Sequence, residues 1–195
     1  MRPASTSLLA HTAATLRGAR NSHFVNDREK QEHERRVFAE FAASASLPVD
    51  EASIRSGERG KPDIFCKLAG MLTYFELARV SDSKMNKLRI RTLLAAVRRG
   101  APVMQKVDAS EFGLPERDVL REKLKNNYET DGAPVDLLLY YDVEDFKALG
   151  AIPPIVGDEF FRDTMGRTLE SSHGPFQRIW VYERYTKKVL WRFPE

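Results

Sequence analysis

Residues 62–76 constrain the fold of this chain more than any other segment, because they read as two strands around a tight turn. The sequence is Pro-Asp-Ile-Phe-Cys-Lys-Leu before Ala69-Gly70 and Met-Leu-Thr-Tyr-Phe-Glu after it. A two-residue hairpin loop at Ala69-Gly70 places Asp63 directly opposite Glu76, with β-carbons about 4.5–5.5 Å apart. Like charges so placed repel each other. A shared divalent cation therefore explains this pair better than a structural role does.

A helix is expected from Asp27 onward, because apolar residues recur there at three- and four-residue steps. These residues are Val37, Phe38, Phe41, Ala42 and Ala45. On a helical wheel, Glu34 falls in the middle of this apolar stripe. Two interpretations stay open: the carboxylate points at the sheet, or it turns outward and favours the positive end of the helix.

The remaining pattern predicts further strands and helices. Val135–Tyr141 is an almost continuous apolar run, typical of a central strand that is buried on both faces. The other expected elements are a weak strand at 49–58, the hairpin at 62–80, helices at 81–99 and from Pro115 to about Tyr128, short helical pieces within 144–176, and an aromatic hairpin at 177–183 and 188–193. The fold class is therefore predicted to be α/β, with a mixed central sheet flanked by helices.

Composition sets limits on the class of protein. The chain has 195 residues, a net charge of +3, one cysteine and four scattered histidines. These numbers favour a single domain over 27–195, a reducing cytoplasmic location and a metal held by oxygen rather than by zinc-type ligands. No run approaches the roughly 18 consecutive apolar residues of a membrane span, so no membrane partner is expected.

Residues 1–26 differ in composition from the rest of the chain. They are rich in Ala, Ser and Thr, carry arginines, and contain no acidic residue before Asp27. We predict a disordered basic extension here. A transit peptide has a similar composition, and translation from an upstream start codon is a further alternative.

The hairpin resembles the motifs of the PD-(D/E)XK nuclease superfamily. Pro62-Asp63 matches its Pro-Asp motif and Glu76-Leu77-Ala78 its Glu-x-Lys motif. With Ser56-Gly57-Glu58 upstream, the pattern looks closest to a divergent branch that reads Glu-x-(Thr/Ala). The resemblance implies a restriction-endonuclease-like core and a hydrolase that cleaves nucleic-acid phosphodiesters with Mg²⁺ or Mn²⁺. It also implies that Asp63, Glu76 and the carbonyl of Leu77 are the metal ligands.

Two further catalytic residues are candidates. The resemblance assigns Glu34 to the acidic site, as the glutamate of the first helix. Ala78 occupies the position of the superfamily's lysine, and the hairpin register places Lys61 opposite Ala78, so Lys61 is the leading substitute for the missing ammonium group. Arg79, Lys84 and Lys87 are alternatives, and Lys61 is also explained as a solvated residue at a strand entrance.

A basic segment follows the hairpin and suits contact with a phosphate backbone. Its positive residues are Lys84, Lys87, Arg89, Arg91, Arg98 and Arg99. Nucleic acid is therefore the expected partner, and a second copy of the chain or another protein stays open. The leading hypothesis is a magnesium-dependent nuclease. The alternative is a catalytically inactive nuclease fold that binds nucleic acid or a protein.

Overall fold

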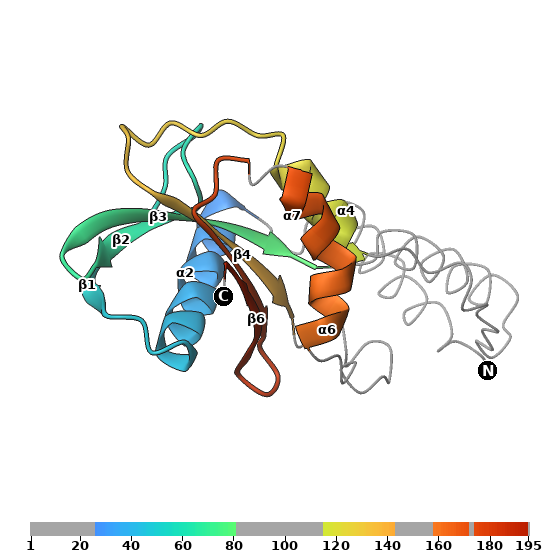
Figure 1. Cartoon of the computed structure of the whole chain (residues 1–195). Coiled ribbons are helices and arrows are strands. Elements are labelled where there is room, and N and C mark those ends of the chain that lie inside the picture. Colours follow the sequence, from blue (N-terminus) through green and yellow to red (C-terminus); the bar gives the residue numbers. More distant parts are fainter. Residues whose placement is uncertain (1–25, 81–114, 143–157, 172–173, 195) are drawn as a thin grey trace, which may run out of the picture. The chain divides into compact units, whose positions relative to one another are not determined.

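The computed structural model describes residues 26–80, 115–142, 158–171 and 174–194 (Figure 1). The chain divides into two compact units, one formed by residues 1–30 and 82–113 and the other by residues 31–81 and 114–195. Only residues 26–30 of the first unit are described. The predicted basic extension and the helix expected at 81–99 lie outside the described residues, apart from Asn26. The single domain predicted over 27–195 stays a prediction.

The described chain contains a six-stranded mixed sheet in the order β1-β2-β3-β4-β5-β6. Strands β1 to β3 are antiparallel, β3, β4 and β5 are parallel, and β6 is antiparallel to β5. The strands are β1 (Val49–Ser56), β2 (Ile64–Leu68), β3 (Met71–Arg79), β4 (Val135–Tyr141), β5 (Arg178–Glu183) and β6 (Lys188–Phe193). The helices are α2 (Asp27–Ser44), α4 (Pro115–Lys123), α6 (Asp158–Phe161), the π-helix η2 (Arg162–Gly166) and α7 (Arg167–Ser171). The predicted α/β class with a mixed sheet is confirmed.

The hairpin of β2 and β3 has the predicted register. Ile64 pairs with Phe75 and Leu68 with Met71, which leaves Ala69 and Gly70 as the two loop residues. Both loop residues have positive φ angles, 49° and 83°, as a type I′ turn requires. The turn therefore sets the pairing at the other end of the hairpin, where Asp63 and Glu76 lie.

Helix α2 covers one face of the sheet with the apolar stripe that was predicted from the sequence. The rings of Phe38 and Phe75 are 4.7 Å apart, and those of Phe41 and Trp180 are 5.4 Å apart. Val37 belongs to the same buried cluster. Since β-strand side chains alternate between faces, this packing assigns the odd-numbered residues of β3 to the side of α2.

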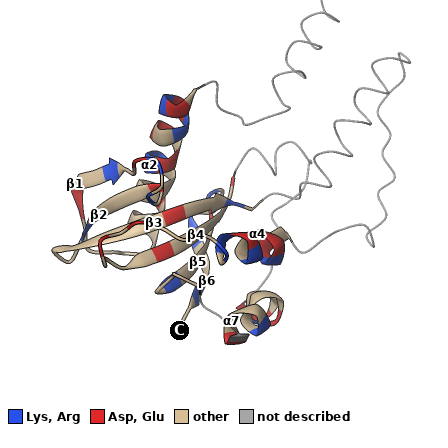
Figure 2. Ribbon diagram, turned by 90° about the horizontal axis from the view of Figure 1, so that it is seen from above, with Lys and Arg blue, Asp and Glu red and all other residues tan. Residues whose placement is uncertain are grey.

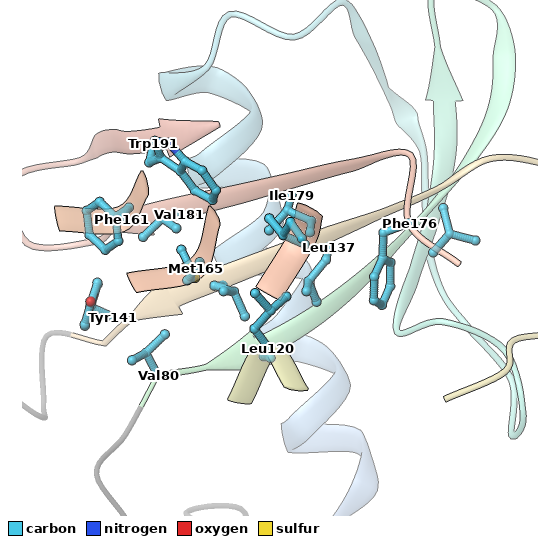
Figure 3. Close-up of a cluster of buried hydrophobic side chains, with 14 of the residues drawn as sticks. Val80, Leu120, Leu137, Tyr141, Phe161, Met165, Phe176, Ile179, Val181 and Trp191 are labelled. Carbon is cyan, nitrogen blue, oxygen red and sulfur yellow. The ribbon is translucent and has the colours of Figure 1, made fainter. Parts of the chain in front are cut away.

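The helices α4, α6, η2 and α7 contribute to the core on the opposite face (Figure 3). Leu120 of α4, Phe161 of α6 and Met165 of η2 are fully buried against β4 and β5, where they meet residues such as Leu137 and Val181. Every residue of β4 is buried, as expected for a strand covered on both faces. The even-numbered residues of β3 share this second face.

One predicted boundary was wrong. Helix α4 ends at Lys123, whereas the sequence pattern had extended it to about Tyr128. The chain tightens beyond the helix, because the amides of Lys125 and Asn126 bond to carbonyls three residues earlier. The pair Asn126-Asn127 favours turns, which explains the early end. No helix among the described residues is long and apolar enough to cross a membrane.

Candidate functional site

Asp63 and Glu76 line one polar pocket of about 380 Å³ beside the end of α4. The lining also includes Gly60, Lys61, Lys125, Asn126, Asn127 and Tyr128. Both carboxylates therefore lie on the same side of the hairpin, as the register predicted. Helix α4 carries acidic and basic positions beside the sheet (Figure 2).

The pocket opens where β2 and β3 stop pairing. Pro62 would face Leu77 in a continued ladder, but it has no N–H group. The Leu77 amide instead donates to Asp63 Oδ2 at 2.9 Å. Gly57 crosses close by and donates its amide to the Asp63 carbonyl at 2.8 Å. Backbone hydrogen bonds thus fix Asp63 at the mouth of the hairpin.

The backbone of β3 turns the Leu77 carbonyl toward the β2 side, where Asp63 lies. Tyr74 and Val80 donate to carbonyls on the β4 side, so even-numbered residues of β3 bond toward β4 and odd-numbered residues toward β2. The backbone groups of Leu77, an odd-numbered residue, therefore point toward β2, and Pro62 opposite it cannot donate a hydrogen bond to the Leu77 carbonyl. Asp63 and Glu76 consequently form a non-hydrogen-bonded pair, the type in which facing side chains approach most closely.

Glu76 is buried, and its charge is balanced by a lysine. Lys123 Nζ lies 2.5 Å from Glu76 Oε1. Burial raises the pKa of Glu76 and the negative charge of Asp63 raises it further, while Lys123 and a hydrogen bond with Tyr128 lower it; the net pKa is above the ordinary value. The ammonium group of Lys123 therefore stabilises the charged form of the buried Glu76.

Tyr128 connects the loop after α4 to the carboxylates. Its hydroxyl accepts a hydrogen bond from Asn126 Nδ2 at 3.2 Å and is hydrogen-bonded to Glu76. Burial raises the pKa of Tyr128, and the charge of Glu76 raises it further. The phenol therefore stays protonated at neutral pH and is the donor toward Glu76.

Lys61 lines the pocket without lying in a strand. Its amide bonds to the Glu58 carbonyl at 3.0 Å, in a turn that precedes β2. The strand pairing predicted between Lys61 and Ala78 does not form, since β2 begins only at Ile64. Ala78 is part of the apolar cluster that contains Leu120. Lys61 thus lines the pocket of the two acids from a loop rather than from a strand.

Glu34 is buried on α2, as its place in the apolar stripe suggested, but the structure does not bring it to Asp63 and Glu76. It lies near Tyr140, whose pKa its charge helps to raise after the larger effects of burial and Asp142. Tyr140 faces α2, whereas Glu76 faces α4. Among the described residues, no three His, Cys, Asp or Glu side chains are grouped so that they could hold a metal ion together.

A separate ionic network joins α2 to the ends of β3, β4 and β5. Arg184 binds both oxygens of Glu40, at 2.9 and 3.0 Å, and Asp142 Oδ1 at 2.9 Å. His33 and Arg79 lie 3.3 and 3.9 Å from Asp142 Oδ2. Burial alone would raise the pKa of Asp142, but the nearby His33 and the two arginines outweigh it and hold that pKa well below its usual range. Arg79, an alternative source of the missing cation, is thus engaged away from the pocket.

Sequence reasoning missed Lys123 and Tyr128. A signal was present for Lys123, because it follows the buried Leu120 by three residues and so shares the face of α4 that meets the sheet. Tyr128 had been assigned to the helix, and its position depends on the turn after Lys123. The six basic residues from Lys84 to Arg99 lie outside the described residues.

The donor groups at the pocket fit a hard divalent cation. Mg²⁺ is usually held by one or two carboxylates, with water and substrate oxygens completing its shell. Asp63 and Glu76 offer such donors in one pocket, and the backbone of Leu77 lies next to them, within hydrogen-bond distance of Asp63. Searches of protein-family models, curated proteins and solved structures found no match to this chain.

Proposed function

We propose that this protein is a Mg²⁺- or Mn²⁺-dependent phosphodiesterase that hydrolyses nucleic acid. The observation that carries the proposal is the opposed pair of Asp63 and Glu76 in a polar pocket, with the ammonium group of Lys123 2.5 Å from Glu76. Such a constellation suits the transfer of a phosphoryl group, which needs negative charge to be stabilised at one point. The restriction-endonuclease-like core belongs to the same proposal.

The proposed roles follow from the positions of the residues. Asp63, Glu76 and the Leu77 carbonyl would hold the cation, which neutralises phosphoryl charge and makes a water molecule more acidic. Lys123 takes the role that Ala78 leaves open, because its ammonium lies beside the carboxylates, where it can stabilise charge or orient water. Lys61 is the second candidate for this role, from the loop before β2.

A catalytically inactive binding domain is the alternative, and one observation favours it. The pair of Lys123 and Glu76 already balances the buried negative charge without a metal ion. An ion pair that serves only stability would look the same. The metal response of the protein separates the two functions.

The proposal is tested by adding Mg²⁺ or Mn²⁺ to wild type and to Asp63→Asn. At ten times the dissociation constant, a bound cation stabilises the native state by about 1.4 kcal/mol, which corresponds to a Tm increase of about 3–6 °C. Asp63→Asn should lose this increase together with metal-dependent cleavage of labelled DNA and RNA. Without metal it should be no less stable than wild type, because repulsion with Glu76 is relieved.

Asp118→Asn is the matched control, since it removes a largely exposed carboxylate from α4. It should keep the metal response and the cleavage. If wild type shows neither a Tm increase at millimolar metal nor cleavage of any single- or double-stranded substrate, the inactive binding domain is the better function.

A further inference from the structure

A second cavity of about 560 Å³ adjoins the acidic pocket, and Tyr128 lines both. Its other walls are largely apolar and include Met71, Pro134, Pro175 and Phe176. The ring of Tyr128 lies 5.7 Å from that of Phe176, while its hydroxyl is hydrogen-bonded to Glu76. One side chain therefore lies between the acidic pocket and the largely apolar cavity.

The cavity lies beside the apolar cluster that contains Leu120, Phe161 and Phe176. Among the labelled residues of that cluster, Phe176 lies at the end away from Phe161 and Tyr141 (Figure 3). Met71, at the start of β3, is 68% exposed. A large apolar side chain so exposed beside an aromatic wall provides a surface on which a flat ring can pack.

The lining of this cavity also includes a positively charged side chain. Arg178 contributes to the wall, and its side chain is 41% exposed. Its guanidinium lies 4.0 Å from Asp136, too far for a hydrogen bond. The guanidinium is ion-paired with the buried Asp136, and its exposed part adds to the cavity wall a positive charge that an apolar ligand alone would not require.

We propose that this cavity binds an unpaired nucleobase next to the scissile phosphodiester, so that the substrate is single-stranded nucleic acid. The inference rests on the proposed function, because the acidic pocket supplies the position of the phosphate. A base in a continuous duplex is paired and stacked, so it cannot enter a side pocket without being unstacked. A single strand offers its bases to aromatic and apolar walls, and Arg178 attracts its next phosphate.

The test measures binding to single-stranded oligonucleotides in which one abasic position is moved along the strand. All variants carry Asp63→Asn and are measured without metal, so that binding is measured in the absence of cleavage. We expect one abasic position to weaken binding about tenfold, the scale of losing one stacked base. Met71→Ala should cause a similar loss, and combining it with that abasic position should add little.

The controls separate this cavity from general electrostatic binding. Leu72→Ala changes the next, 44% exposed residue, which does not line the cavity, and should bind as the parent does. Arg178→Ala should weaken binding and lower the salt dependence by about one ion. A duplex of the same sequence should bind equally well with and without Met71→Ala.

Equal tolerance of abasic sites at every position would overturn the inference, as would equal loss of single-strand and duplex binding by Met71→Ala. If Met71→Ala instead changes only the sedimentation of the protein, the cavity belongs to a contact between copies of the chain. The two proposals fail separately. If wild type cleaves nucleic acid but no abasic position weakens binding more than the others, only the proposed base site is refuted. If one abasic position weakens binding but wild type cleaves no substrate, only the proposed enzymatic activity is refuted.

Discussion

Replacing Lys123 by methionine should destabilise the protein by about 2–3 kcal/mol at neutral pH. The Lys123 ammonium lies 2.5 Å from the buried Glu76 carboxylate, and removing one partner of a fully buried ion pair costs about 3–5 kcal/mol. The Lys123 side chain is 23% exposed, so water screens part of this interaction and the lower figure is expected. Methionine keeps most of the apolar stem, which limits the change to the charge.

The loss should depend on pH in a direction that the pKa of Glu76 sets. Burial and the charge of Asp63 raise that pKa above the ordinary 4.5, so the native state binds more protons than the unfolded state as the pH falls toward that value. Stability contributed by Glu76 therefore increases on acidification. Without Lys123 the pKa rises further, and protonation removes the uncompensated charge. The difference between Lys123→Met and wild type should shrink from pH 8 to pH 5.

Urea unfolding at pH 8 and pH 5 measures both effects, provided that the m-values of the variants agree. Lys125→Met is the matched control, since Lys125 lines the same pocket but is exposed, and it should unfold near the wild-type midpoint. Glu76→Gln should recover much of the stability lost by Lys123→Met, because a neutral amide needs no counter-charge. A Lys123→Met midpoint equal to that of wild type at pH 8 would refute the reasoning.

The same variant distinguishes the two proposed functions. A divalent cation at Asp63 and Glu76 competes with the ammonium of Lys123 for Glu76. If the pocket binds Mg²⁺, the metal should raise the Tm of Lys123→Met by more than that of wild type. An ion pair with a purely structural role gives no metal response in either protein.

Two other substitutions test the supports of the site and of the fold. Gly57→Ala would place its Cβ 1.8 Å from the Pro62 carbonyl oxygen, so the free energy of unfolding should fall by about 1–3 kcal/mol in chemical denaturation. The displacement of Asp63 should also weaken the Tm increase on adding metal. A variant with wild-type stability would contradict this packing. Arg184→Gln should lower the free energy of unfolding by about 3–5 kcal/mol, because Glu40 and Asp142 would lose their shared partner. A double-mutant cycle with Glu40→Gln should show a coupling energy above about 0.5 kcal/mol. Additive losses would indicate that the pair contributes little.

Short-range patterns were sufficient to predict most of the elements. The turn at Ala69-Gly70 is determined by two adjacent residues, and strand alternation then fixes Asp63 opposite Glu76. The buried strand Val135–Tyr141 was predicted with its observed bounds, because its apolar run leaves no solvent-facing side. The stripe that buries Glu34 on α2 follows from helical periodicity in the same way.

Only the tertiary structure decided which charged groups meet. Periodicity places Glu34 on the apolar stripe of α2 and Lys123 on the side of α4 that carries Leu120, but it does not tell which face of the sheet each helix covers. Helix α2 lies on the face opposite Glu76, and α4 lies on the face of Glu76, so Lys123 reaches the carboxylate and Glu34 does not. The partners Lys123 and Glu76 are 47 residues apart in sequence. Such contacts arise from the packing of separate elements, whereas the hairpin arises from neighbouring residues, and for this reason the sequence alone predicted the acid pair but not the lysine beside it.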